Sequence, residues 1–119
     1  MQVWKFGGTS VGKPERMQSI RQLITEDGKP KIVVLSALSG STNALLSISE
    51  SLIAQNQAEA KTKASELRAH YDAFLTELYQ TPAGLAKGQA IVTKEFTFIE
   101  SLIATVPYTV KQEKEMVAL

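Results

Sequence analysis

The sequence predicts an α/β domain in which a strand–helix–strand unit comes first and a mostly helical segment follows. Three patterns lead to this prediction. A short apolar run and a glycine turn precede a helix start at Pro14, and a second apolar run covers residues 31–36. Apolar residues at helical spacing then occupy most of the chain after residue 43. Strand, helix and strand in this order are typical of a parallel sheet with helices packed on it.

The first expected strand covers residues 2–6, where bulky side chains suit a short buried strand. Gly7 and Gly8 follow it directly. A backbone without Cβ atoms lets a ligand approach the main chain closely. Thr9 and Ser10 then add two hydroxyl groups. This turn is therefore the first candidate for a binding loop.

A helix is expected to begin at Pro14, because the fixed φ of proline suits the first helical position. The free N–H groups and the positive dipole end of a helix start attract anions. Lys5 adds a full positive charge beside the turn. The sequence thus predicts a phosphate-binding loop with a lysine directed at the transferred group. The alternative is a tight turn between strand and helix with a surface lysine.

The second expected strand is the unbroken apolar run within residues 31–36, which follows a turn at Asp27-Gly28. A run without alternation predicts that both faces of the strand are covered, as in a parallel sheet flanked by helices. Ligands bind such sheets outside the carboxyl ends of the strands. The loops at residues 7–12 and 37–42 would both lie at those ends.

The second loop repeats the chemistry of the first, with small, hydroxylic and glycine residues before a helix. Thr42 or Asn43 is expected to cap that helix, because such side chains accept hydrogen bonds from the first N–H groups. For Ser41, Thr42 and Asn43, helix capping alone is the alternative to a role in binding. Two such loops placed side by side favour a role in binding more strongly than either loop alone.

The remaining chain is expected to be helical. A long amphipathic helix should run from about Ala60 to Leu78 and end before Thr81-Pro82, and another should end near Pro107. A last short helix is expected from Val110, with Met116 and Val117 directed inward. The residues that mark the helix ending near Pro107 are Ile91, Phe98, Ile99, Leu102 and Ile103.

Composition narrows the classes of function. The 119 residues carry a net charge of +1 with acids and bases interspersed, which argues against a nucleic-acid partner. There is no cysteine, so disulfides, thiolate metal sites and a cysteine nucleophile are excluded. No stretch approaches the roughly 20 apolar residues that span a bilayer. We therefore expect a soluble, cytoplasmic protein that binds no membrane, and we expect no metal ligands from the lone His70.

A P-loop is the first alternative for the glycine turn. Residues 7–13 follow the pattern G-x-x-x-x-G-K, but Pro14 stands where that pattern needs a Ser or Thr hydroxyl for Mg²⁺. Proline supplies neither this hydroxyl nor a backbone N–H. Lys13 would have to act without a hydroxyl residue beside it, so a P-loop is disfavoured.

Three motifs carry a resemblance to a known family. Residues 5–11 (KFGGTSV), 33–37 (VVLSA) and 40–43 (GSTN) agree in order and spacing with the start of the aspartokinases. The chain thus resembles the N-terminal portion of an amino-acid-kinase (carbamate-kinase-like) fold. The resemblance implies an ATP-dependent kinase that phosphorylates the side-chain carboxylate of aspartate, on the way to lysine, threonine and methionine.

The resemblance also assigns roles to individual residues. Lys5 matches the lysine that contacts the ATP phosphates and stabilises the moving phosphoryl group, and it is the one catalytic candidate. The positions matched to nucleotide binding are Lys5, Gly7, Gly8, Thr9 and Ser36. Thr42 is the first candidate for an aspartate contact, and Ser39 and Gly40 would shape the same pocket. Mg²⁺ is expected with ATP, although no carboxylate of the chain matches a metal ligand.

The family pattern implies more chain than residues 1–119. Further aspartate-binding residues, the adenine-binding half of the sheet and C-terminal regulatory domains of the ACT type have no counterpart here. We therefore expect a partial catalytic domain that is inactive alone and self-associates through its uncovered surfaces. Kinases for glutamate, acetylglutamate, carbamate or UMP are the alternatives within the fold. A non-catalytic assembly module and a helical interaction domain are the alternatives outside it.

Overall fold

The structure is a computed structural model that describes residues 1–105 and 110–119, with side chains for 1–105 and 114–119. Two strands and six helices follow one another along it. They are β1 (Gln2–Phe6), α1 (Gly8–Val11), α2 (Pro14–Thr25), β2 (Lys31–Leu35), α3 (Ser41–Ile53), α4 (Gln57–Leu78), α5 (Pro82–Ile103) and α6 (Val110–Val117). The predicted order of a βαβ unit and a mostly helical segment is confirmed.

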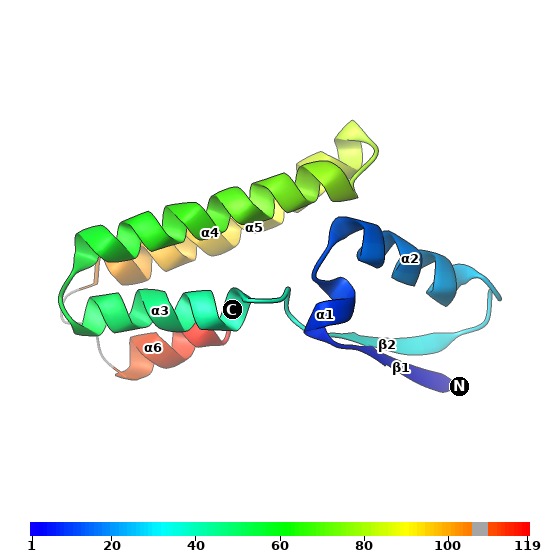
Figure 1. Ribbon diagram of the computed structural model, residues 1–119, viewed down its shortest axis with the longest axis horizontal. Coiled ribbons are helices and arrows are strands. Elements are labelled where there is room, and N and C mark those ends of the chain that lie inside the picture. Colours follow the sequence, from blue (N-terminus) through cyan, green and yellow to red (C-terminus); the bar gives the residue numbers. More distant parts are fainter. Residues whose placement is uncertain (106–109) are drawn as a thin grey trace.

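The molecule is elongated, with extents of 51 × 31 × 19 Å. The βαβ unit lies at one end and the helices α3 to α6 form a bundle at the other (Figure 1). The C-terminal end of α4 reaches back to α2, where the side-chain amide of Gln18 donates a hydrogen bond to the carbonyl of Leu78. Helix α4 therefore joins the two parts.

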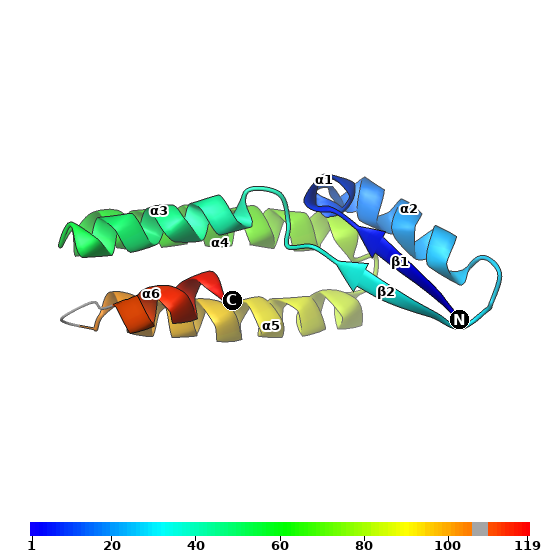
Figure 2. The same ribbon diagram turned by 90° about the horizontal axis from the view of Figure 1, so that it is seen from below.

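The sheet consists of β1 and β2, which pair in parallel from Gln2 opposite Lys31 to Phe6 opposite Leu35. Helix α2 lies along one face of it (Figure 2). Because side chains alternate across a strand, Trp4 and Val33 lie on that face, and both are half-buried.

The opposite face of the sheet has no helix over it among the described residues. Val3, Ile32 and Val34 are 65%, 50% and 44% exposed there. The prediction that both faces are covered is therefore wrong for residues 1–105 and 110–119. Apolar residues occupy every position of β2 after Lys31, so the sequence pattern could not show which face is open. We call this surface, formed by Val3, Ile32, Val34 and Lys5, the open sheet face.

The segment between β1 and α2 differs from the expectation. The glycine turn continues into the one-turn helix α1, with Gly7 as its N-cap, before α2 begins at Pro14. The start of α2 at Pro14 is as predicted. Val11, at the end of α1, is buried and anchors this turn.

The long helices pack antiparallel, and α3 and α6 pack beside them (Figures 1 and 2). Ile48 and Met116 are fully buried at their centre, so Met116 points inward as predicted. The helix that Ile91 and Phe98 helped to predict is present, although these two side chains are exposed on it. Helix α5 begins at Pro82 and ends at Ile103, and the expected stop at Pro107 lies outside the described residues.

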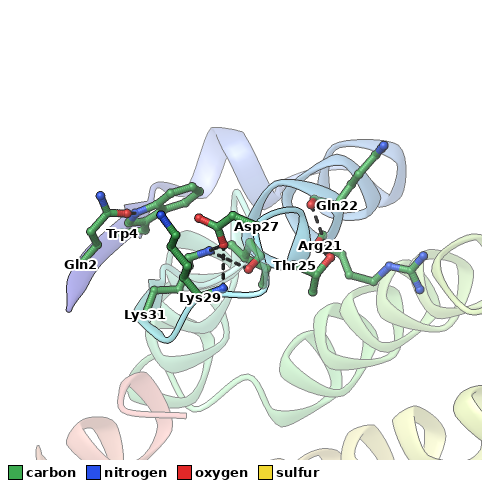
Figure 3. A network of polar contacts seen from close by, with 9 residues as sticks. Gln2, Trp4, Arg21, Gln22, Thr25, Asp27, Lys29 and Lys31 are labelled. Atoms are coloured by element: carbon green, nitrogen blue, oxygen red, sulfur yellow. Dashed lines mark hydrogen bonds and ion pairs between the residues drawn. The ribbon is translucent and has the colours of Figure 1, made fainter.

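A polar network fixes the turn between α2 and β2 (Figure 3). The Lys31 ammonium, on a side chain only 4% exposed, lies 2.7 Å from a carboxylate oxygen of Asp27 and donates to the Ile24 carbonyl at 2.9 Å. It also lies 4.7 Å from the centre of the Trp4 ring. The same Asp27 oxygen accepts the backbone N–H of Lys29. The hydrogen bond from Lys31 and that from the Lys29 N–H hold the pKa of Asp27 below its ordinary value.

This pKa shift predicts a pH-dependent contribution of Asp27 to stability. A carboxylate whose pKa is lower in the folded state stabilises the fold above its unfolded pKa, and this stabilisation is lost as pH falls through the folded pKa. Asp27→Asn should therefore lower the free energy of unfolding at pH 7 and have less effect near pH 3. Urea unfolding at the two pH values measures this. Glu26→Gln is the matched control, and an equal effect of Asp27→Asn at both pH values would contradict the prediction.

Candidate functional site

The two candidate loops lie in contact at the carboxyl ends of the paired strands. The Ser36 N–H donates to the Phe6 carbonyl at 3.0 Å, which continues the sheet to the start of the second loop. A Cβ atom on Gly8 would lie 3.3 Å from the Ala37 carbonyl oxygen, and one on Gly12 would lie 3.1 Å from the Ser39 Cβ. The prediction that the loops lie side by side is confirmed.

The glycines of the first loop have two different explanations. Gly8 and Gly12 permit the close packing of the loops, since a Cβ atom would be crowded at either position. Gly7 has a φ of −75°, which any residue adopts, and a Cβ atom there would meet nothing within 4 Å. Neither backbone conformation nor packing within the described chain calls for glycine at position 7. The close approach of a ligand would call for it.

Lys5 lies on β1 directly before this loop and pairs with Val34 in the sheet. It is exposed on the open sheet face. Its ammonium makes no hydrogen bond or ion pair with the residues whose side chains are described. A lysine with an uncommitted charge at the end of a parallel strand can meet an anion that binds in the loop beside it.

Thr9 and Ser36 complete the predicted nucleotide-binding set. Thr9 is exposed in α1, and its carbonyl accepts the Gly12 N–H at 3.4 Å and a guanidinium N–H of Arg16 at 2.9 Å. Ser36 directly follows β2, and its side chain is exposed. Ser36 therefore lies at the end of β2, and Thr9 lies in the helical turn that follows β1.

The start of α3 differs from the expectation. Gly40 is the N-cap, in a left-handed conformation with φ of 85°, and the helix begins at Ser41. The prediction that Thr42 or Asn43 caps α3 is wrong, because both lie inside its first turn. Ser39, Gly40 and Thr42 are exposed beside the first loop. The Thr42 hydroxyl therefore does not cap α3, which was the alternative to a role in binding.

Two contacts of the site were missed by sequence reasoning. Ser41 is buried and shares a hydrogen bond with the Tyr71 hydroxyl, which ties the start of α3 to the middle of α4. Arg16 holds the Thr9 carbonyl from the first turn of α2. The partners of each contact are 30 and 7 residues apart in the chain, and no local pattern indicates either contact.

The described residues contain neither a cluster suited to a metal ion nor a helix suited to a membrane. Residues 1–105 and 114–119 bring together no group of three acidic or histidine side chains that could hold a metal ion. Within the described ranges, no helix has the length and apolarity needed to cross a membrane. What the two loops and Lys5 offer is backbone N–H groups, hydroxyls and a cation, which suit an anionic ligand.

Known proteins are similar to this chain in sequence and in structure, although no family model matches it. Over 56 residues the chain is 43% identical to an aspartate kinase of Pseudomonas putida and 41% identical to an aspartokinase of Pseudomonas aeruginosa. Its structure matches that of Escherichia coli aspartokinase III in complex with aspartate and ADP, with a TM-score of 0.69 and 26% identity over 99% of this chain. The chain is therefore similar to the N-terminal part of the aspartokinases.

The match covers only a small part of each relative. The chain spans 14% of the length of the two Pseudomonas aspartokinases and 25% of the E. coli aspartokinase III chain. Its α/β structure is the first portion of the amino-acid-kinase fold, as the motifs predicted. A Haemophilus influenzae protein, provisionally named an inactive aspartokinase 3, is 40% identical over 48 residues. Those 48 residues are 40% of each of the two chains, so the two have about the same length.

Proposed function

We propose that the chain forms the phosphate-binding part of an aspartate kinase. This enzyme transfers the γ-phosphate of ATP to the side-chain carboxylate of L-aspartate and gives 4-phospho-L-aspartate, the first step towards lysine, threonine and methionine. The packing of the two loops, with Gly8 against the Ala37 carbonyl, is the observation that carries the proposal. The structural relative binds aspartate and ADP, the substrate and the nucleotide product of this reaction.

The first loop is proposed to bind the ATP phosphates. Phosphoryl transfer needs aligned reactants and positive charge where the transition state spreads its negative charge. Backbone N–H groups of Gly7, Gly8 and Thr9 would hold the phosphate oxygens, and the Ser36 hydroxyl would add a donor from the neighbouring strand end. The Lys5 ammonium would neutralise the charge of the moving phosphoryl group.

The second loop is proposed to bind aspartate. The exposed Thr42 hydroxyl would donate a hydrogen bond to the substrate from the first turn of α3. Ser39 and Gly40 would form the wall next to the first loop, where Ser39 already packs against Gly12. Because the loops touch, the acceptor carboxylate and the phosphates would lie next to each other, as an in-line transfer needs.

Mg²⁺ is proposed to enter with ATP. In phosphoryl-transfer sites it binds mainly phosphate oxygens and water, with one or two carboxylates. The described residues bring together no cluster of acidic side chains that could hold it. We therefore assign no step to a protein-bound ion in this chain.

We propose that the protein is cytoplasmic. We also propose that the 119-residue chain does not turn over ATP by itself. The chain corresponds to a quarter of the E. coli enzyme, and its described residues contain only two strands of sheet. The Haemophilus relative has about the same length and is provisionally named inactive, which favours the same conclusion. A role as a non-catalytic partner in an assembly is the second candidate function, and this relative is the observation that favours it.

A chimera tests the kinase function. Residues 1–56 of this chain, which end just before α4, would replace the matching N-terminal segment of the Pseudomonas putida enzyme. We expect aspartate-dependent ADP release from the chimera, because both loops are transferred intact, and none from the purified 119-residue chain. A chimera that unfolds cooperatively but releases no ADP with aspartate would contradict the proposal. ADP release that depends on glutamate, carbamate or UMP instead would identify another kinase of this fold.

A further inference from the structure

Helix α1 is a single turn with few hydrogen bonds of its own. It spans four residues, Gly8–Val11, and an isolated helix of this length is unstable in water. Its closing backbone bonds are long, at 3.2 Å from the Val11 N–H to the Gly7 carbonyl and 3.4 Å from the Gly12 N–H to the Thr9 carbonyl. The last carbonyls of a helix have no partner within it. Contacts from outside must therefore keep this turn helical.

Arg16 supplies such a contact. Its Nη1 donates a hydrogen bond to the Thr9 carbonyl at 2.9 Å, shorter than the 3.4 Å bond from Gly12 to the same oxygen. A cation at the C-terminal end of a helix also interacts favourably with the helix dipole. Arg16 is on the first turn of α2, which is fixed by Pro14 and by the packing of Ile20. Helix α2 thus stabilises the single turn of α1 through the hydrogen bond of Arg16.

We propose that Arg16 is a positioning residue for the first loop: its guanidinium keeps α1 helical and holds the Thr9 carbonyl away from the proposed phosphate site. This inference rests on the proposed function. A carbonyl oxygen turned toward the site would repel phosphate, and a frayed turn would no longer direct the N–H groups of Gly8 and Thr9. Arg16 acts through these backbone groups and is not itself placed on the substrate.

Amide hydrogen exchange of the 119-residue chain, followed by NMR, tests the structural step. In Arg16→Met, the amides of Val11 and Gly12 should exchange about fivefold to tenfold faster, as expected for the loss of one charge-assisted hydrogen bond. The Ile20 amide in α2 should keep its rate. Arg21→Met is the control, since the Arg21 side chain makes no hydrogen bond with the described residues. Unchanged exchange of Val11 and Gly12 in Arg16→Met would overturn the proposal.

Titration with inorganic triphosphate tests the consequence for binding. We expect chemical-shift changes at the amides of residues 7–10 in the wild-type chain and an apparent Kd at least fivefold weaker in Arg16→Met. Lys13→Met removes the same charge next to the loop but no hydrogen bond to it, so it should weaken binding much less. Arg16→Lys, which retains one donor, should recover part of the affinity. Equal loss in Lys13→Met and Arg16→Met would overturn the positioning role.

The two measurements separate this proposal from the one on which it rests. A wild-type chain whose amides at residues 7–10 do not respond to triphosphate would contradict the phosphate site itself. The exchange rates of Val11 and Gly12 would still decide whether Arg16 holds α1. Faster exchange combined with unchanged triphosphate binding would overturn the positioning role while leaving the phosphate site in place.

Discussion

Lys5→Met is expected to abolish aspartate-dependent ADP release by the chimera, with a fall in kcat on the order of 10³-fold or more. Removal of a single group that stabilises transition-state charge costs about 10²- to 10³-fold in other enzymes, and a full cation at the transferred group should lie at or above that range. Lys5 is exposed and makes no hydrogen bond or ion pair with the described side chains, so its loss should leave the fold intact. Coupled-assay kinetics and thermal unfolding of the variant measure the two effects.

Lys13→Met provides the matched control in the same chimera. Lys13 also lies beside the first loop, and it is the lysine that a P-loop would use. We expect its replacement to change kcat less than threefold. If Lys13→Met abolished activity and Lys5→Met did not, the assignment of the phosphate-binding lysine would be wrong and the P-loop alternative would return.

The second large effect is expected in the association state of the chain. We propose that the 119-residue chain self-associates through the open sheet face, since contiguous exposed apolar residues on a short sheet with free edges favour pairing with another copy. Replacement of Ile32 and Val34 by lysine should convert assemblies into a monomer of 13.0 kDa. Sedimentation velocity over a range of concentrations measures this directly.

The control variant replaces two apolar residues that are equally exposed but lie outside the sheet. Ile53 and Ile91 are 58% and 62% exposed on α3 and α5, away from the sheet. Their double replacement by lysine adds the same charge and should leave the assemblies unchanged. A wild-type chain that sediments as a compact monomer at all concentrations would contradict the prediction, and so would dissociation caused by the control variant.

The parts of the fold that follow local rules could be predicted from the sequence. The start of α2 depends on the fixed φ of Pro14, and the long helices α4 and α5 show their periodicity over 22 residues each. The two loops contain enough glycine and hydroxyl residues to be predicted as candidate binding loops. Their contact follows from the parallel pairing of β1 and β2, which the order of strand, helix and strand implies.

Other features of the fold and the site could not be predicted from the sequence. Capping by Thr42 follows from a local rule, but the left-handed Gly40 makes the turn and takes that place. The bond between Ser41 and Tyr71 depends on how α3 and α4 cross. The open sheet face escaped prediction because β2 is apolar at each position between its first residue and Ser36, which hides the alternation that would distinguish its two faces.

The contact between Gln18 and the Leu78 carbonyl has a mechanical consequence. Helix α4 has 22 residues, which makes it a stiff rod about 33 Å long. One end of this rod joins α3 in the bundle, and the other touches α2, whose first turn carries Arg16. A tilt of the bundle end of α4 would therefore displace its other end against α2. Helix α2 carries Arg16, which bonds the Thr9 carbonyl in the glycine turn.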